Sequence, residues 1–533
     1  MKNRYIATAG LMIGLMMFSV SCKKYLDVNK DPNNPSQVSA ANRLVGAITT
    51  SNGAALWRGA REVAAISQYA CAENRNSAET WRMTSSYFIW QNAYTWALPN
   101  CVDLVALGKK EGKPEFIGAG ETLMAVNFGL LTDQLGSIVV DDYYNGETQI
   151  NLIPKFNDQQ TVYQRIDSLL NDAVANFAKA GSRNSLNSTG GDIMYHGDID
   201  KWTRFAWALK ARYLNHLSKK TGLYNPAKII DACSHAFNAD GMDAEFPHLA
   251  GALETDENPW YSWGGFDTTA GVNIHSDPYY FPRYLTWSQF FVNMLTSFPV
   301  TNTLYTDPRI GKIMQPAASD GQYRGLPAGG RLTGGQGLLP NGQPGDATKT
   351  HRSDYGFFSR SGFYTNQTSP TPFITYSEVK FIEAEARLRS GDATGALNAY
   401  TEGVNANMRK LGVSSADMAT YWAAQNADGL ATHFSNLTEG LSHIMREKYI
   451  SLCLNPEAWV DMRRVDYSQA IYGPSLVRPK DLNPIFNAGD PTQWILAMCY
   501  ENNEELRNPD AIKSVGGNTP IIRLLTPLWW DKP

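Results

Sequence analysis

Aromatic side chains dominate one stretch of this sequence, and their types and spacing suggest ligand binding. From Trp260 to Phe291, 11 of 32 residues are aromatic, against 11% of the whole 533-residue chain. Short polar residues such as Asn258 and Asp267 interleave with them. A flat ring can stack on the C–H face of a sugar while amides and carboxylates bond its hydroxyls, and the same walls suit peptides. Five residues are therefore predicted to contact a ligand: Trp260, Tyr261, Trp263, Tyr279 and Tyr280.

A second aromatic cluster runs from Trp81 to Trp96. Trp81 and Trp90 are its candidate ligand contacts. Tyr87, Trp90 and Tyr94 recur at three- and four-residue spacing and so share a helical face, which favours core packing for these three rings. Core packing is also favoured for three rings at helical spacing in the first cluster: Tyr284, Trp287 and Phe291.

Catalytic motifs are absent from the sequence, which contains no Gly-x-Ser-x-Gly, no His-Glu-x-x-His and no phosphate loop. The segment Ser377–Lys380 matches Ser-x-x-Lys by letter, but it lies in an amphipathic helical pattern and no partner motif follows. Glu383 and Glu385 are two residues apart and point in different directions on a helix. A glycosidase pair would need distant carboxylates that meet in space. We predict that the protein is not an enzyme.

Composition argues against a nucleic-acid or metal-dependent function. The net charge is −4, whereas proteins that neutralise nucleic-acid phosphates are basic. The chain has only 8 His and 6 Cys, and no two cysteines have the CxxC spacing of zinc or redox sites. Asp27, Asn29 and Asp31 mimic the start of a calcium loop, but Pro32 stands where that loop needs Gly. We predict no metal, no cofactor and no nucleic-acid partner.

The N-terminal residues look like a bacterial lipoprotein signal. Two basic residues precede an uncharged apolar run over residues 6–20, which is too short to span a bilayer and suits a secretory signal. Small residues then lead to Cys22. We predict a signal peptide over residues 1–21, acylation of the Cys22 thiol and a lipidated linker over residues 22–40. An ordinary cleaved signal with an incidental cysteine is the alternative.

Amphipathic helices must position these groups. A helical pattern from Tyr376 stops at Gly391, and Asp392 caps a second helix that ends near Gly412. Alanines at close-packing positions make this hairpin similar to a tetratricopeptide unit. Apolar residues at three- and four-residue spacing predict further helices: residues 163–177, 199–217 and 438–454.

These elements predict a mainly α fold in which helical hairpins form a scaffold and loops form a ligand-binding side. Residues 41–533 are predicted as the folded domain. The aromatic and Gly-rich residues 240–365 are predicted as a loop region inserted into it. Long irregular stretches inside a compact protein are often functional, which fits the aromatic ligand contacts placed there.

Six segments in one order resemble the SusD/RagB family of outer-membrane nutrient-binding lipoproteins of Bacteroidetes, and its SusD-like second subfamily. The segments that carry the resemblance are Cys22–Pro35, Gly197–Arg212, Tyr376–Arg387, Arg446–Ser451, Glu457–Trp459 and Arg463–Arg464. They span most of the chain. The sequence departs from the family after Arg464, because relatives often continue with Thr-Gly whereas Val465 and Asp466 follow here.

The resemblance implies a tetratricopeptide-like α–α superhelix anchored at the outer membrane and facing the cell exterior. It implies a lid-like partner of a SusC-like TonB-dependent channel that captures oligosaccharides or peptides for import. It carries over no binding residue by motif, so the seven candidate residues rest on the aromatic pattern alone. Two alternatives stay open: a lipid-anchored glycoside hydrolase with dispersed carboxylates, and a tetratricopeptide-like scaffold that holds a protein partner.

Overall fold

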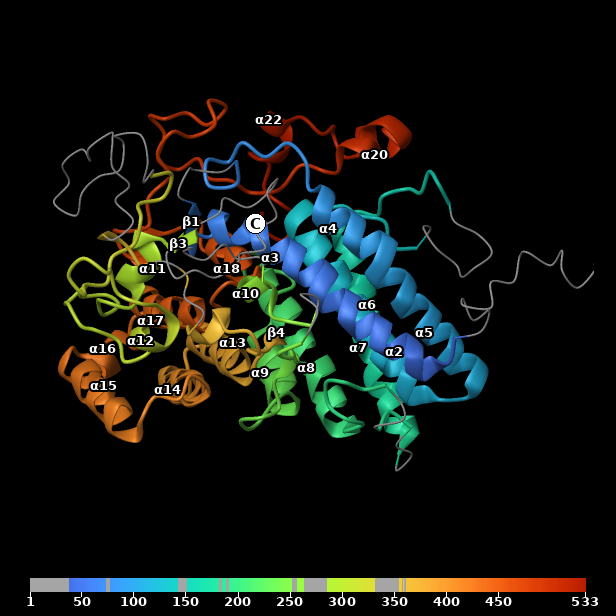
Figure 1. The fold of residues 1–533 in the computed structure, drawn as a ribbon, viewed down its shortest axis with the longest axis horizontal. Coiled ribbons are helices and arrows are strands. Elements are labelled where there is room, and N and C mark those ends of the chain that lie inside the picture. Colours follow the sequence, from blue (N-terminus) through green and yellow to red (C-terminus); the bar gives the residue numbers. More distant parts are fainter. Residues whose placement is uncertain are drawn as a thin grey trace, which may run out of the picture.

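Helices make up most of the described structure, so the predicted mainly α fold is confirmed (Figure 1). The computed structural model describes residues 38–72, 77–141, 151–181, 185–187, 191–251, 256–262, 285–330, 354–356, 358 and 361–533. Two small antiparallel sheets accompany the helices. They pair β1 (Ala70–Ala72) with β3 (Leu285–Trp287) and β2 (Ala244–Phe246) with β4 (Thr371–Ile374).

The first half of the chain builds a layer of long helices that lie side by side (Figure 1). Its helices are α2 (Ala40–Thr49), α3 (Trp57–Ile66), α4 (Tyr87–Gln91), α5 (Leu98–Glu111), α6 (Pro114–Leu135), α7 (Gln159–Ala180), α8 (Ile199–His216) and α9 (Pro226–His235). Two π-helical segments, η2 (Thr50–Leu56) and η3 (Asn92–Ala97), join α2 to α3 and α4 to α5. They pack against each other, so both widened turns lie at one place in the layer.

The second half of the chain continues the scaffold with shorter helices. They are α13 (Tyr376–Arg389), α14 (Ala393–Lys410), α15 (Ser415–Ala427), α16 (Leu430–His433), α17 (Leu437–Ser451), α18 (Glu457–Arg464), α19 (Gln469–Tyr472), α20 (Asn502–Arg507), α21 (Pro509–Ser514) and α22 (Pro520–Arg523). The helices predicted over 163–177, 199–217 and 438–454 correspond to α7, α8 and α17, with ends shifted by a few residues.

The α13–α14 hairpin has the predicted glycine after its first helix and the predicted N-cap before its second. Gly391 has φ +85°, and the Asp392 side chain accepts a hydrogen bond from the Gly395 amide at 2.8 Å. Small residues let the two helices approach closely, since a Cβ on Gly403 would lie 3.0 Å from the Phe381 ring. This tetratricopeptide-like packing confirms the hairpin read from the sequence.

Residues 240–365 carry only short elements in the part that the structure describes. These are β2, β3, α10 (Pro259–Ser262), α11 (Gln289–Met294), α12 (Ile310–Ile313) and η7 (Phe363–Thr365). Trp287 and Phe291 are fully buried, which confirms the core-packing interpretation for those two rings. Tyr284 lies outside the described residues.

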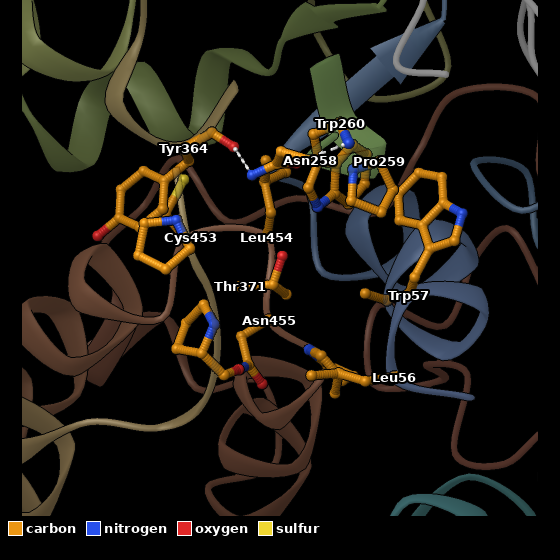
Figure 2. A pocket seen from close by; sticks show the side chains of 14 residues that line it. Leu56, Trp57, Asn258, Pro259, Trp260, Tyr364, Thr371, Cys453, Leu454 and Asn455 are labelled. Carbon is orange, nitrogen blue, oxygen red and sulfur yellow. Dashed lines mark hydrogen bonds between the residues drawn. The ribbon is translucent and has the colours of Figure 1, made fainter. Parts of the chain in front are cut away.

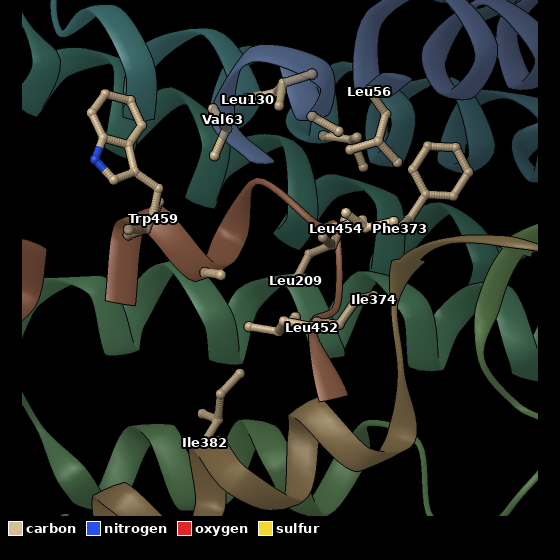
Figure 3. Packing of buried hydrophobic residues seen from close by; sticks show 14 of the residues in the cluster. Leu56, Val63, Leu130, Leu209, Phe373, Ile374, Ile382, Leu452, Leu454 and Trp459 are labelled. Carbon is tan, nitrogen blue, oxygen red and sulfur yellow. The ribbon is translucent and has the colours of Figure 1, made fainter. Parts of the chain in front are cut away.

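The hydrophobic core joins elements from distant parts of the chain (Figure 3). Leu56 and Val63 meet Phe373 from β4 and Trp459 from α18, with Leu209 of α8 close by. One cluster of buried residues extends from Ala40 to Trp530. The proposed domain boundaries themselves stay a prediction.

The turn after Arg464, where the sequence departs from the family, is strained. Asp466 and Tyr467 have φ of 53° and 50°, a region that glycine adopts without cost. Lys219 donates to Asp466 at 2.6 Å, and replacing Asp466 with either Gly or Ala removes that contact equally.

We therefore expect Asp466→Gly to be more stable than Asp466→Ala by about 1 kcal/mol, because only Ala keeps a Cβ in the left-handed region. Urea unfolding of the two variants measures this difference directly, and each variant serves as the control for the other. Equal stabilities would mean that the positive φ of Asp466 stores no strain.

Candidate functional site

The aromatic crevice is formed where Trp260 of α10 meets Trp57 at the start of α3 (Figure 2). Their ring centroids lie 4.6 Å apart at an interplanar angle of 83°, an edge-to-face contact. Phe358 packs on Trp260 with a centroid separation of 5.9 Å. Trp260 is only 4% exposed and Trp57 only 2%, so the two indoles present little surface to solvent.

Asn258 positions Trp260 in this crevice. Its side-chain oxygen accepts a hydrogen bond from the Trp260 amide at 2.8 Å, and its Nδ2 donates to the Ser369 carbonyl at 2.8 Å. A second, longer bond of 3.4 Å reaches the Tyr364 carbonyl (Figure 2). The short helix α10 is thus fastened to the chain between Tyr364 and Ser369.

The crevice is too narrow for a sugar ring. The centre of a water molecule fits in only about 20 Å³ of it. One buried water needs roughly 10–15 Å³ by that measure. Pro370, Pro372 and Pro456 stiffen its far side, and no Asp or Glu belongs to its lining. The described lining therefore supplies no carboxylate pair of the kind that glycoside hydrolysis needs.

The structure describes four of the seven predicted contacts: Trp81, Trp90, Trp260 and Tyr261. Trp81 is fully buried against Phe486, and Trp90 is 7% exposed and donates from Nε1 to Glu504 at 3.2 Å. Their burial favours the core-packing alternative. Tyr261 is half-buried beside Trp260, while Trp263, Tyr279 and Tyr280 lie outside the described residues. Ligand contact at these positions stays a prediction.

Trp57, which lines the crevice, and Trp96, which does not, were not among the ligand contacts predicted from the sequence. Trp57 stands alone in an Ala-rich helical pattern, and nothing in its neighbourhood signals that it faces Trp260 across more than 200 positions. Trp96, in η3, is 53% exposed and is the most exposed tryptophan of the described chain. Its position in the second aromatic cluster was the one sequence feature that could have pointed to Trp96.

The charged residues of the family segments form a buried network instead of a reactive site. Arg212 of α8 donates to both carboxylate oxygens of Glu378 on α13 at 2.7 Å. Glu457 of α18 lies 3.7 Å from Arg212 and 2.7 Å from His216 Nε2. Burial alone would raise the pKa of Glu457, but the His216 and Arg212 charges outweigh it and lower the pKa to about 2.

A second part of the network joins α13 to α17 and α18. Arg464 makes a bidentate pair with Glu385 at 2.9 and 2.8 Å and contacts Asp461 at 2.6 Å. Lys448 of α17 pairs with Asp461 at 2.8 Å. All four side chains are at most 3% exposed. The segments that carry the family resemblance therefore hold the four helices α8, α13, α17 and α18 together.

A pair of histidines, His433 of α16 and His443 of α17, gives the fold a predictable pH dependence. His433 Nδ1 and His443 Nε2 lie 2.9 Å apart, and His443 is fully buried. Burial is the main reason that the pKa of His443 falls to about 3, and the neighbouring His433 and Arg446 lower it further.

Because the unfolded chain protonates His443 near pH 6.5 and the folded chain only near pH 3, the unfolded state binds more protons between these values. Stability should fall as the pH drops from 6.5, with a slope of up to about 1.4 kcal/mol per pH unit from this group. His443→Phe should flatten the slope of urea-unfolding free energy between pH 7 and 5. His235→Gln, at an exposed histidine, is the matched control and should leave it unchanged.

Neither a membrane-spanning helix nor a metal cluster is found in the part of the chain that the structure describes. No described helix is long and apolar enough to cross a bilayer. No group of three or more His, Cys, Asp or Glu side chains there could hold a metal ion.

Solved structures with this fold are numerous, and they cover nearly the whole chain. A SusD/RagB family protein from Bacteroides thetaiotaomicron matches with a TM-score of 0.64 at 21% identity, covering 93% of this chain and 99% of its own. A SusD homologue from Parabacteroides distasonis reaches 0.70 at 18% identity, covering 92% and 98%. A protein titled chitin-binding gives 0.65 at 18% identity, covering 92% and 100%. At these identities the likeness establishes the fold.

The family itself comes from the sequence profile. Curated protein sequences contain no match to this chain. The profile of a family named SusD-like_2, described as "Starch-binding associating with outer membrane", matches residues 32–479. This range covers most of the 533 residues and includes five of the six family segments in full. The chain therefore belongs to the SusD-like family, as its sequence motifs indicated.

Proposed function

We propose that this chain is an outer-membrane lipoprotein that binds oligosaccharides and delivers them to a SusC-like TonB-dependent channel, without acting as an enzyme. Peptides are the alternative ligand class. The observation that carries the proposal is the match of residues 32–479 to a family described as starch-binding and associated with the outer membrane. One structural relative titled chitin-binding also supports a glycan as the ligand class.

The aromatic residues around α10 support the same proposal. Tyr261 is half-buried and follows Trp260 of the crevice directly, and further aromatic residues follow Ser262 in the sequence. The crevice lined by Trp57 and Trp260 leaves no room for a sugar ring. Trp263, Tyr279 and Tyr280 therefore remain candidate ligand contacts on the aromatic pattern of the sequence alone.

Co-purification tests the proposal most directly. The tagged chain, extracted from its native outer membrane in mild detergent, should bring down a TonB-dependent channel in stoichiometric amount. Recovery of the chain alone, under conditions that preserve such complexes, would contradict delivery to a channel.

Loss of one stacked ring should weaken ligand binding measurably. Trp263→Ala is expected to cost about 1–2 kcal/mol of binding free energy, a roughly five- to thirty-fold rise in Kd, measured by calorimetry with the oligosaccharide that binds best. Trp422→Ala removes an indole of α15, outside both aromatic clusters of the sequence, and should leave Kd unchanged. Equal affinities of the parent and Trp263→Ala would remove Trp263 from the site.

A further inference from the structure

A cavity beside the buried charge network has the size of an internal water site. It lies between η2, α6, α8, β4 and the start of α18. The centre of a water molecule fits in about 40 Å³ of it. All twelve residues that line it are buried. Since one buried water needs roughly 10–15 Å³ by this measure, the cavity has room for about three water molecules.

Both apolar and polar side chains line this cavity. Leu56, Leu130 and Phe373 are among the apolar ones (Figure 3). The charged and amide side chains of the lining are Asp133, Gln134, Arg212, Asn455 and Glu457. A wholly apolar cavity stays dry, whereas a buried water needs two to four polar partners. The polar side chains therefore decide what the cavity can bind.

Gln134 of α6 gives the strongest indication of a bound molecule. Its side chain is 3% exposed, and neither Oε1 nor Nε2 has a hydrogen-bond partner among the described residues. Leaving a buried polar group unpaired costs the full penalty of removing it from water, so such groups are rare unless water or a ligand pairs them. Because Gln134 lines the cavity, a molecule held there can supply the missing partners.

Arg212 and Glu457 also keep hydrogen-bonding positions that the described residues do not use. Arg212 donates from Nε and Nη2 to Glu378 and to the Phe373 carbonyl, and none of these bonds uses Nη1. Glu457 Oε1 lies 2.7 Å from His216 Nε2. Its Oε2 lies 3.7 Å from Arg212 Nε, which is too far for a direct hydrogen bond. Water commonly bridges polar groups at such a separation.

The charges of the lining select water over an ion. An anion in the cavity would lie beside the carboxylates of Asp133 and Glu457, and a cation would lie beside the Arg212 guanidinium. Among the described residues, no group of three or more His, Cys, Asp or Glu side chains could hold a metal ion. A water molecule donates to carboxylates and to an amide oxygen, and it also accepts from a guanidinium and an amide N–H. It therefore matches donors and acceptors in the same cavity.

We propose that this cavity holds a cluster of about three water molecules that joins Gln134 of α6 to Arg212 of α8 and Glu457 of α18. The site is separate from the aromatic region and does not rest on the proposed function. The ion pairs described above connect α8, α13, α17 and α18. The water cluster adds a link from these helices to the end of α6, in the layer built by the first half of the chain.

A crystal structure of the protein at a resolution that shows ordered water tests the proposal. We expect about two to four solvent peaks in the cavity, with one of them within roughly 2.7–3.2 Å of the Gln134 amide. Another should lie within the same distance of Arg212 Nη1 or Glu457 Oε2. A cavity without solvent density would overturn the proposal. So would a peak at roughly 2.3–2.6 Å from several oxygen atoms, because those are the distances of a bound calcium ion.

Gln134→Met distinguishes an amide that water pairs from an amide that has no partner. Methionine keeps the length of the side chain but cannot replace the hydrogen bonds of the amide. We expect the solvent peak nearest the amide to be lost and the urea midpoint to fall. Leu130→Met is the matched control, because it places methionine on the same helix and in the same lining without removing a polar group. This variant should keep all the solvent peaks.

A urea midpoint that rises in Gln134→Met would overturn the proposal, because relief of an unpaired buried amide stabilises a protein. Equal midpoints of Gln134→Met and Leu130→Met would overturn it as well, since the amide would then contribute no hydrogen bond to stability. The solvent peaks of the parent protein test the proposal even if Gln134→Met fails to fold.

Discussion

Arg464→Met is expected to lower the free energy of unfolding by about 3–5 kcal/mol, the largest stability effect predicted for this protein. Arg464 is fully buried and holds both carboxylate oxygens of Glu385 together with one oxygen of Asp461. Methionine has a similar length but no charge, so the substitution leaves two buried carboxylates without their shared cation. Removing one partner of a buried pair costs far more than the pair contributes by its presence.

Urea unfolding at pH 7 measures this loss, with Arg409→Met as the matched control. Arg409 also pairs with two carboxylates, those of Asp240 and Glu402 at 2.6 and 2.8 Å, but it is 39% exposed. Solvent screens that pair, so its loss should cost no more than about 1 kcal/mol. If Arg464→Met fails to fold, Glu385→Gln removes one charge with little change of shape and should give the same direction. Similar losses at Arg464 and Arg409 would contradict the structural role of the network.

This network explains why family membership was readable from the sequence while the ligand site was not. Charged residues of the family segments pair with residues that are distant in the sequence. Arg212 pairs with Glu378, and Arg464 pairs with Glu385. A change at one such residue leaves the other buried and unpaired, so the letters cannot vary independently. A ring that meets a ligand on a loop has no such partner within the protein.

The positions of the main helices could be predicted from apolar spacing, and their ends from capping residues. Asp392 caps α14 through a bond to the third residue after it, as the sequence predicted, and Asp198 caps α8 in the same way. The π-helical segments η2 and η3 were not predicted, because one extra residue in a turn leaves the apolar periodicity nearly intact. Only the structure identifies η2 and η3, and it shows that they pack against each other.

Burial of single rings could not be predicted from composition. Trp260 and Trp81 occur among polar and turn-forming residues, which favours exposure, yet each is covered by residues hundreds of positions away. Trp57 covers Trp260, and Phe486 with Trp494 covers Trp81. The predicted burial of Trp287 and Phe291 is confirmed, but Trp287 lies in β3 and Phe291 in α11, so the two rings do not share the helical face that their spacing suggested.

Cys22→Ser is expected to remove nearly all of the protein from the outer-membrane fraction. Cys22 lies outside the described residues, so this prediction rests on the sequence and on the family. Each buried CH₂ of an acyl chain contributes about 0.8 kcal/mol to membrane binding, and several chains on one residue give lasting attachment where one chain does not. Serine offers no thiol to acylate. Fractionation with carbonate extraction, followed by immunodetection, measures the change.

The control must separate loss of acylation from failure of signal cleavage, because an uncleaved apolar run over residues 6–20 could itself retain the chain at a membrane. A second variant therefore carries the Cys22→Ser change behind a signal that the general signal peptidase removes, and mass spectrometry of the product establishes its N-terminus. This cleaved chain should be released in full, because it carries neither the acyl chains nor the apolar run over residues 6–20. If the cleaved Cys22→Ser chain stayed with the outer membrane after carbonate extraction, protein contacts rather than the lipid would hold the molecule there.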